Sequence, residues 1–251
     1  MNNTKVIWII SLSLILGLGL NALIMGRGFE RFRKEDRYIS VKGFSEREVK
    51  SDLAVWAIQC RVSNDDIQLG SQEIEAVKNK IVSFLKKNGI QDHEIIQKEV
   101  IVHDKKSQDY GNFNEALSYR FNIDKMLQVR SSNVENVQRV SRMTDQLLKM
   151  GVWLNNQNSY EGPVRYYYTK LNDIKSSMLV EATKNAKSAA QNFASESEEK
   201  LGKLKRASQG YFSIVDRDAS LSGSDGGYYL SGELDVYKKI RVVVKVDYSI
   251  E

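Results

Sequence analysis

A run of uncharged, mostly apolar residues near the N-terminus constrains this chain more than any other feature of its sequence. Residues 6–26 contain no charged side chain. At about 1.5 Å per residue, a helix of this length spans about 30 Å, the thickness of the hydrocarbon core of a bilayer. A buried helix of that length would normally show a polar face, which this run lacks. We therefore expect a transmembrane anchor or signal-anchor over residues 6–26, after an N-terminal tail of residues 1–5.

The flanks of this run bear on its cleavage and its orientation. Lys5 gives only a weak basic start, and the apolar run continues past the small residues Gly17 and Gly19, which favours an uncleaved anchor over a cleaved signal peptide. The charged juxtamembrane linker of residues 27–37 then carries five basic side chains. By the positive-inside rule alone, these basic residues place the following domain in the cytoplasm.

The rest of the chain shows the alternation of half-buried strands and the spacing of amphipathic helices. From Ile240 to Ile250 every second residue is apolar, and most residues between them are polar or charged, which predicts a strand with one solvated face. By similar patterns we expect strands near residues 39–44, 52–63, 94–103, 117–123, 152–168 and 205–215. Helices are expected over residues 67–89, 132–151 and 171–201, the second with a capping box from Ser132 to Glu135 and the third with a stripe of alanines ending at Phe193.

This order of elements predicts an α+β domain over residues 38–251. It reads as two β-α-β-β-type units with antiparallel sheet and packed helices, preceded by one N-terminal transmembrane helix. The units look like an internal duplication, and they would share one sheet or pack as two layers. Hydrophobic residues are 41% and charged residues 27% of the chain, which is enough apolar surface for a core.

Several short motifs follow this order of elements. They are the glycine of ISVKG, an aspartate leading the second strand, the FLKKNGI end of the first helix, a tyrosine after the next strand, and glycines in the later elements. The residues are Gly43, Asp52, Leu85, Gly89, Ile90, Tyr110, Gly151, Gly202 and Gly232. In this order the motifs resemble the SIMPL-domain family of bacterial envelope proteins. The resemblance covers about residues 38–250. The chain departs from the family at Ser51, where relatives usually carry proline.

The resemblance implies an extracytoplasmic domain, and some relatives assemble into ring- or cage-like homo-oligomers. For orientation, we give this resemblance more weight than the positive-inside rule. The resemblance then implies a single-pass protein of the bacterial inner membrane with its large domain in the periplasm. The basic linker then lies near the outer leaflet, where Arg27, Arg31, Arg33 and Lys34 are candidate contacts for lipid headgroups.

No pattern points to catalysis, so we expect no catalytic residue, cofactor or metal. His93 and His103 lie ten residues apart, which is about 33 Å along a strand, too far to share a metal. Cys60 falls on the apolar face of its strand and reads as a buried thiol. The basic cluster of Lys200, Lys203, Lys205 and Arg206 has no interleaved aromatic residues, so no nucleic-acid partner is expected.

Tyrosines form the most informative cluster for function. Strand packing explains them, but tyrosine is also favoured at protein interfaces. The candidates for an oligomer interface are Tyr166, Tyr167, Tyr168, Tyr228 and Tyr229. The first hypothesis is therefore a membrane-anchored protein that self-assembles into a closed homo-oligomer. The alternative is a monomeric or dimeric envelope module that binds a small ligand or partner, in connection with stress.

Overall fold

The computed structural model describes residues 37–107, 119–155, 164–218 and 233–250, together with isolated positions between Trp8 and Met25. Most of residues 6–26, the linker side chains Arg27, Arg31, Arg33 and Lys34, and Tyr110 and Gly232 lie outside the described residues. Within the described part of the chain, no helix has both the length and the apolar character to cross a membrane. The anchor therefore stays a prediction.

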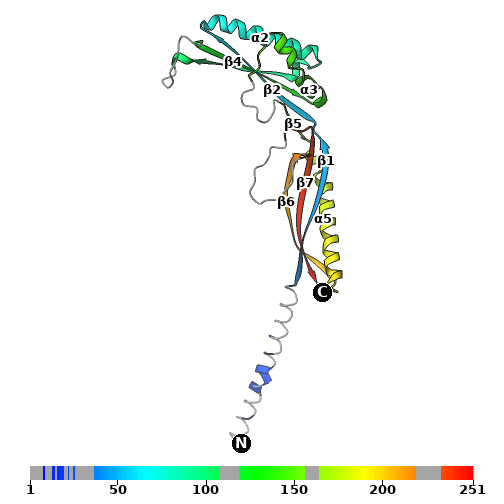
Figure 1. Cartoon of the computed structure of the whole chain (residues 1–251). Coiled ribbons are helices and arrows are strands. Elements are labelled where there is room, and N and C mark those ends of the chain that lie inside the picture. The colour runs from blue at the N-terminus through cyan, green and yellow to red at the C-terminus, as the bar shows by residue number, and fades with distance from the viewer. Residues whose placement is uncertain are drawn as a thin grey trace. The chain divides into compact units, whose positions relative to one another are not determined.

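The expected order of strands and helices is confirmed (Figure 1). The elements are β1 (Tyr38–Lys50), β2 (Leu53–Asn64), α2 (Ile67–Lys87), β3 (Ile95–Asp104), β4 (Phe121–Ser131), α3 (Val134–Ser141), α4 (Asp145–Lys149), β5 (Val164–Tyr167), α5 (Leu171–Glu196), β6 (Leu201–Asp216) and β7 (Tyr237–Ile250). Single turns of 3-10 helix, Asp92–Glu94 and Lys105–Ser107, flank β3.

The strands form two separate sheets, one of three strands in the order β1-β7-β6 and one of four in the order β3-β4-β2-β5. The expected second unit of β5, α5, β6 and β7 does not form a sheet of its own. β5 pairs with β2 in the other sheet, and β1 completes the sheet of β6 and β7. The order of elements agrees with the expected one, but in the sheets β1 takes the place expected for β5.

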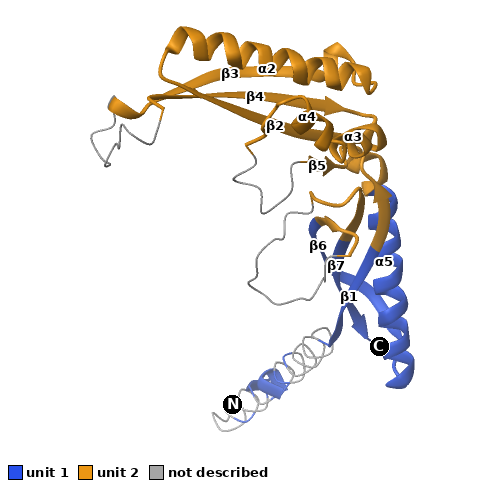
Figure 2. Ribbon diagram, turned by 45° about the horizontal axis from the view of Figure 1, so that its top comes forward, with its two compact units in different colours: residues 1–45, 176–212, 242–251 blue, residues 46–175, 213–241 orange. Residues whose placement is uncertain are grey.

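The chain divides into two compact units, which Figure 2 colours separately. One comprises residues 1–45, 176–212 and 242–251, and the other comprises residues 46–175 and 213–241. Strands β1, β6 and β7 each contribute residues to both units.

Large side chains fill the core on one face of the four-stranded sheet. Trp56 and Ile58 of β2 and Leu127 of β4 are at most 1% exposed. Helix α2 packs on β2 and β4, and its buried residues Ile74, Ile81, Phe84 and Leu85 join the same cluster. The Asp66 carboxylate caps this helix by accepting hydrogen bonds from the backbone N–H groups of Gln68 and Leu69. Gly89, with φ of +88°, follows its end as the sequence predicts.

Several boundaries differ from the sequence-based expectation, and polar contacts explain two of the differences. Residues 132–151 form two short helices, α3 and α4, and the N-cap of α3 is Asn133, whose side chain accepts from the Asn136 N–H. Ser132 is therefore not the cap. Strand β1 continues through its polar stretch to Lys50, because Glu46 pairs with Arg241 on β7. Strand β4 begins only at Phe121.

The three-stranded sheet is covered by α5 through small residues. Met178, Ala182, Ala186, Ala190 and Ala194 form the buried stripe of this helix, so the predicted alanine contact is confirmed, whereas Phe193 is 60% exposed and does not belong to it. A Cβ atom added at Gly43 on β1 would overlap the backbone of Ala182 and Ala186. The helix backbone therefore lies directly against the strand.

Candidate functional site

The tyrosine segment of residues 166–168 lies at the edge of the four-stranded sheet. In the antiparallel pairing of β5 with β2, Tyr166 lies opposite Ala54 and Tyr167 opposite Leu53. Since neighbouring residues of a strand point to opposite faces, the two side chains separate. Tyr166 is 5% exposed and belongs to the core cluster of its own chain, so it has no surface to give to a partner. Tyr167 and Tyr168 are half-buried.

Glu233 joins this segment to the stretch that carries the other predicted tyrosines. Its backbone C=O accepts from the Tyr166 N–H at 2.7 Å. Its carboxylate pairs with Arg165 at 3.0 Å and accepts from the Tyr167 hydroxyl at 3.3 Å. Tyr228 and Tyr229 lie outside the described residues. The described chain resumes at Glu233, which contacts Tyr166 and Tyr167.

Asp216 ties the two ends of that same segment together. Its carboxylate accepts from the Lys238 ammonium at 2.6 Å and from the backbone N–H groups of Leu234 and Asp235. Lys238 is fully buried, with a side chain 0% exposed. This ion pair therefore closes the base of the segment between β6 and β7.

Asp52 fixes the other side of the tyrosine segment. Its carboxylate accepts from the Thr169 N–H at 2.8 Å and from the Thr169 hydroxyl at 3.0 Å. The preceding residue, Ser51, donates its backbone N–H to Val236 C=O at 2.8 Å. A proline at this position could not make that bond, which gives a structural reason for the departure at Ser51.

Burial and Glu233 shape the acidity of these tyrosines. Burial raises the pKa of the Tyr166 hydroxyl, and burial followed by the nearby Glu233 carboxylate raises the pKa of Tyr167. Burial also raises the pKa of Tyr168. The three hydroxyls therefore stay protonated near neutral pH, and they act as hydrogen-bonding groups rather than as anions.

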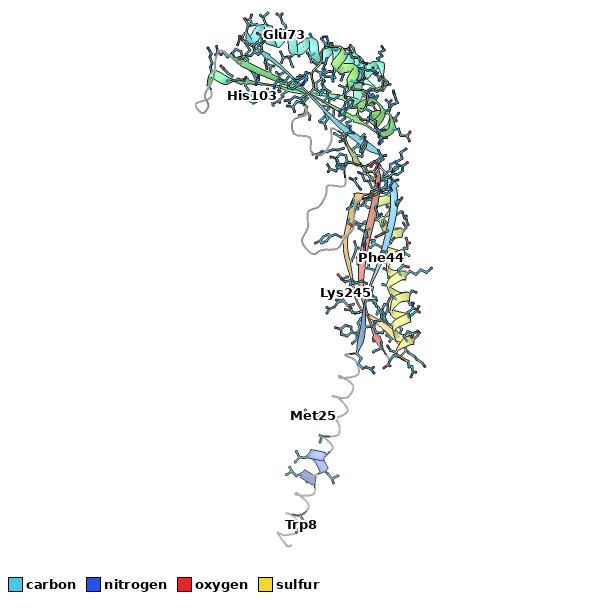
Figure 3. All side chains as sticks on the ribbon, viewed as in Figure 1. Trp8, Met25, Phe44, Glu73, His103 and Lys245 are labelled. Carbon is cyan, nitrogen blue, oxygen red and sulfur yellow. The ribbon has the colours of Figure 1, made fainter. Side chains whose placement is uncertain are left out.

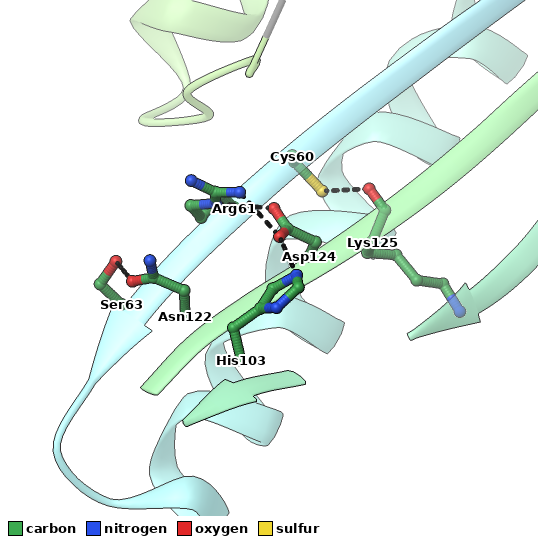
Figure 4. Close-up of polar contacts among 7 residues, drawn as sticks. All are labelled: Cys60, Arg61, Ser63, His103, Asn122, Asp124 and Lys125. Atoms are coloured by element: carbon green, nitrogen blue, oxygen red, sulfur yellow. Dashed lines mark hydrogen bonds and ion pairs between the residues drawn. The ribbon is translucent and has the colours of Figure 1, made fainter. Parts of the chain in front are cut away.

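A second polar group, which sequence reasoning missed, lies on the face of the four-stranded sheet opposite the core (Figure 4). Arg61 on β2 and Asp124 on β4 are cross-strand partners. The Arg61 guanidinium donates to both carboxylate oxygens of Asp124 at 2.8 Å. The Asp124 side chain is only 6% exposed. No local pattern pairs residues of two distant strands, so only the register of β2 with β4 reveals this contact.

The remaining candidates do not assemble into a catalytic set around this pair. The His103 Nε2 lies 3.7 Å from an Asp124 oxygen, whereas His93 is on the exposed turn before β3. Cys60 is fully buried, and burial, followed by the Asp124 charge, raises its pKa to about 11. No cluster of three metal-binding side chains occurs among the residues that the structure describes. The arrangement is that of a structural ion pair.

Edge strand β3 carries a further surface that the sequence did not single out. Val100, Ile101 and Val102 are consecutive, so they point to both faces of the strand, and they are 42%, 55% and 43% exposed. β3 pairs only with β4, and the other edge has no partner strand among the described residues. Sequence analysis does not reveal such a surface, because three consecutive apolar residues in a strand are usually buried.

Comparison with known proteins identifies one family. The model of the SIMPL family, described as a protein of unknown function (DUF541), matches residues 39–247. A search of curated proteins found no match.

Proposed function

We propose that this chain, which belongs to the SIMPL family, is a membrane-anchored protein of the bacterial cell envelope that assembles into a closed homo-oligomer. Residues 6–26 would hold it in the inner membrane as a single-pass anchor, with the large domain in the periplasm. The uncharged run of those residues supports the anchor. The partners would be further copies of the chain and the bilayer, without enzymatic activity and without nucleic acid.

The observation that carries the assembly is the exposed edge of β3. An edge strand offers unpaired backbone groups to a strand from another chain. Part of this edge is protected, because the pairing with β4 shifts register between Gln97 and Val100, at the charged residues Lys98 and Glu99. Among the residues that the structure describes, nothing protects the stretch from Val100 to Val102 in this way, and this stretch combines an unpaired edge with exposed apolar side chains.

Closed symmetry is the usual outcome when a chain repeats one contact with copies of itself. Tyr167, the last residue of β5, and Tyr168 after it provide a second, partly exposed surface at the other edge of the four-stranded sheet. A closed ring needs two surfaces on each subunit when its contacts are head-to-tail. Tyr166 is left out of this proposal because it is buried. Tyr167 also binds Glu233 of its own chain, so Tyr168 is the cleaner residue to change.

The assembly is tested by the mass of the full chain in detergent, measured by light scattering on a sizing column. Ile101→Lys places a charge on the free edge, and we expect it to lower the oligomer mass. Leu148→Lys is the matched control, because Leu148 is a similarly exposed apolar residue, at 59%, but lies on α4. Both variants should keep the circular dichroism spectrum of the unmodified chain.

A wild-type chain with the mass of one subunit would reject assembly and would direct work to the ligand-binding alternative, through a search for ligands that raise the melting temperature. An unchanged mass of the Ile101→Lys variant would reject the β3 edge as the contact. The anchor is tested separately by carbonate extraction of membranes, from which a chain anchored by residues 6–26 should not be released. Release into the soluble fraction would contradict the anchor.

A further inference from the structure

The outer face of the three-stranded sheet, opposite α5, presents a patch of lysines and aromatic residues. The inner face is fixed by Val41 and Gly43 of β1, which lie against the helix, so the alternating residues Lys42 and Phe44 point outward. On β7 the buried residues Val244 and Val246 place Lys245 on the same outer face. Phe44 and Lys245 are labelled in Figure 3.

Two of these lysines lie opposite each other across β1 and β7. The Ile250 N–H donates to Arg37 C=O, and the Ser51 N–H donates to Val236 C=O. Both contacts define one antiparallel register, in which Lys42 is the cross-strand neighbour of Lys245. Like charges directly opposite each other destabilise a sheet. Both side chains are exposed, so an anion from outside the chain can offset this cost.

Further cationic and aromatic groups surround the pair. Lys205 on β6 lies with its ammonium 6.0 Å from the ring centroid of Tyr38, which brings it to the same end of the sheet. Tyr38 is 56% and Phe44 is 51% exposed. Asp247, two residues after Lys245, is the acid on this part of the outer face among the described residues. Three lysines against one aspartate leave the patch positively charged.

We propose that this patch, formed by Tyr38, Lys42, Phe44, Lys205 and Lys245, binds the anionic headgroups of the membrane that holds the N-terminal segment. The proposal rests on the anchoring proposed above. Tyr38 follows Gly26 by twelve residues, which reach at most about 40 Å when fully extended. The tether keeps the patch close to the bilayer, so a weak contact is engaged at high effective concentration. Lysine attracts anionic lipid, and tyrosine is favoured at the headgroup level.

The test measures how fast each lysine is acetylated when the full chain is held in lipid nanodiscs. Discs of phosphatidylcholine alone are compared with discs that also contain phosphatidylglycerol, at low salt. We expect acetylation of Lys42, Lys205 and Lys245 to slow about fivefold in the anionic discs, as expected for one lysine drawn to such a surface. Lys184 and Lys187, exposed on α5 of the same compact unit, are internal controls that should not slow.

A matched pair of variants sharpens the test. K42Q/K245Q should abolish the slowing at Lys205, and K184Q/K187Q should leave it unchanged. Equal rates in both kinds of disc, or slowing of the α5 lysines as well, would overturn the proposal. Slow acetylation of the patch lysines already in detergent would also overturn it, because it indicates that a second copy of the chain covers the patch. Slower acetylation in neutral discs after addition of free glycerol phosphate would overturn it too, because it indicates that the patch binds a soluble anion.

The anchor has its own readout in this experiment. Retention of the chain on neutral discs at high salt reports the anchor, whereas the lysine rates report the patch. A chain that binds only the anionic discs, with Lys42 and Lys245 protected, would reject the anchor and support the patch. A chain that binds neither kind of disc would reject both.

Discussion

The two sheets of this molecule are each covered by a helix, but the contacts are built from opposite kinds of side chain. Helix α2 covers its sheet with Ile81, Phe84 and other large residues. Helix α5 covers its sheet with alanines, and its backbone lies against Gly43. The contact of α2 gains stability from the large apolar side chains that it buries, and the contact of α5 gains stability from the close packing of the helix backbone on the strand. The two therefore differ in which substitutions they tolerate.

The largest effect is expected from removing volume in the four-stranded core. Trp56→Ala should lower the free energy of unfolding by about 4 kcal/mol, because Trp56 is only 1% exposed and its loss leaves a cavity. Urea unfolding followed by circular dichroism measures this. The matched control is Trp153→Ala, since Trp153 is 52% exposed and should cost less than about 1 kcal/mol. Similar costs for both variants would contradict a core built on large side chains.

The opposite substitution probes the contact of α5. Gly43→Ala should cost about 3 kcal/mol, because the added Cβ meets helix backbone that cannot rotate away. Gly70→Ala in α2 is the counterpart, since its Cβ would lie 2.6 Å from the flexible end of Ile123. That variant also gains helix propensity, about 1 kcal/mol, and should be close to neutral. If Gly43→Ala proves neutral as well, α5 does not approach β1 as closely as described.

The smallest effect concerns reactivity, and it tests whether the large-residue core stays closed. Burial raises the pKa of Cys60 to about 11 from an ordinary 9.0. At pH 8 its thiolate fraction is therefore about a hundredfold lower in the folded chain than in the unfolded chain. Alkylation by iodoacetamide should be slower by at least that factor without urea. Comparable rates with and without urea would show that this core opens readily.

The raised pKa of Cys60 also makes the stability of the fold depend on pH. The folded chain holds the Cys60 proton more tightly than the unfolded chain does, so the contribution to stability is fully present below about pH 9. It is lost as the pH rises from there through about 11.

The same comparison explains which parts of the fold the sequence predicted. β7 was predicted almost to its ends, because its alternation is regular and one face is buried. The stripe of α5 was misread at Phe193, because a large apolar residue was taken for core, whereas the buried stripe from Ala182 to Ala194 consists of alanines. The strand expected near residues 117–123 runs instead from Phe121 to Ser131. Its alternation is broken where the polar residues Asp124 and Lys125 are both buried.

Long-range pairing was not accessible from local patterns. The pairing of β5 with β2 and of Arg61 with Asp124 joins residues far apart in the chain. For the tyrosines, the sequence did not predict the orientation of each side chain: Tyr166 belongs to the core, whereas Tyr167 and Tyr168 are half-buried. If the alternation of buried and exposed residues along β5 is assigned one residue out of step, Tyr166 and Tyr167 exchange places between core and surface.

The place of β7 between β1 and β6 has a consequence for how the protein is made. The central strand of this sheet is the last one synthesised, and β1 is the first. During synthesis, β1 must therefore wait without its neighbour in this sheet until β7 has been made. Contacts between such distant segments also slow folding. A sheet of this order can form only after its first and last strands have both been made.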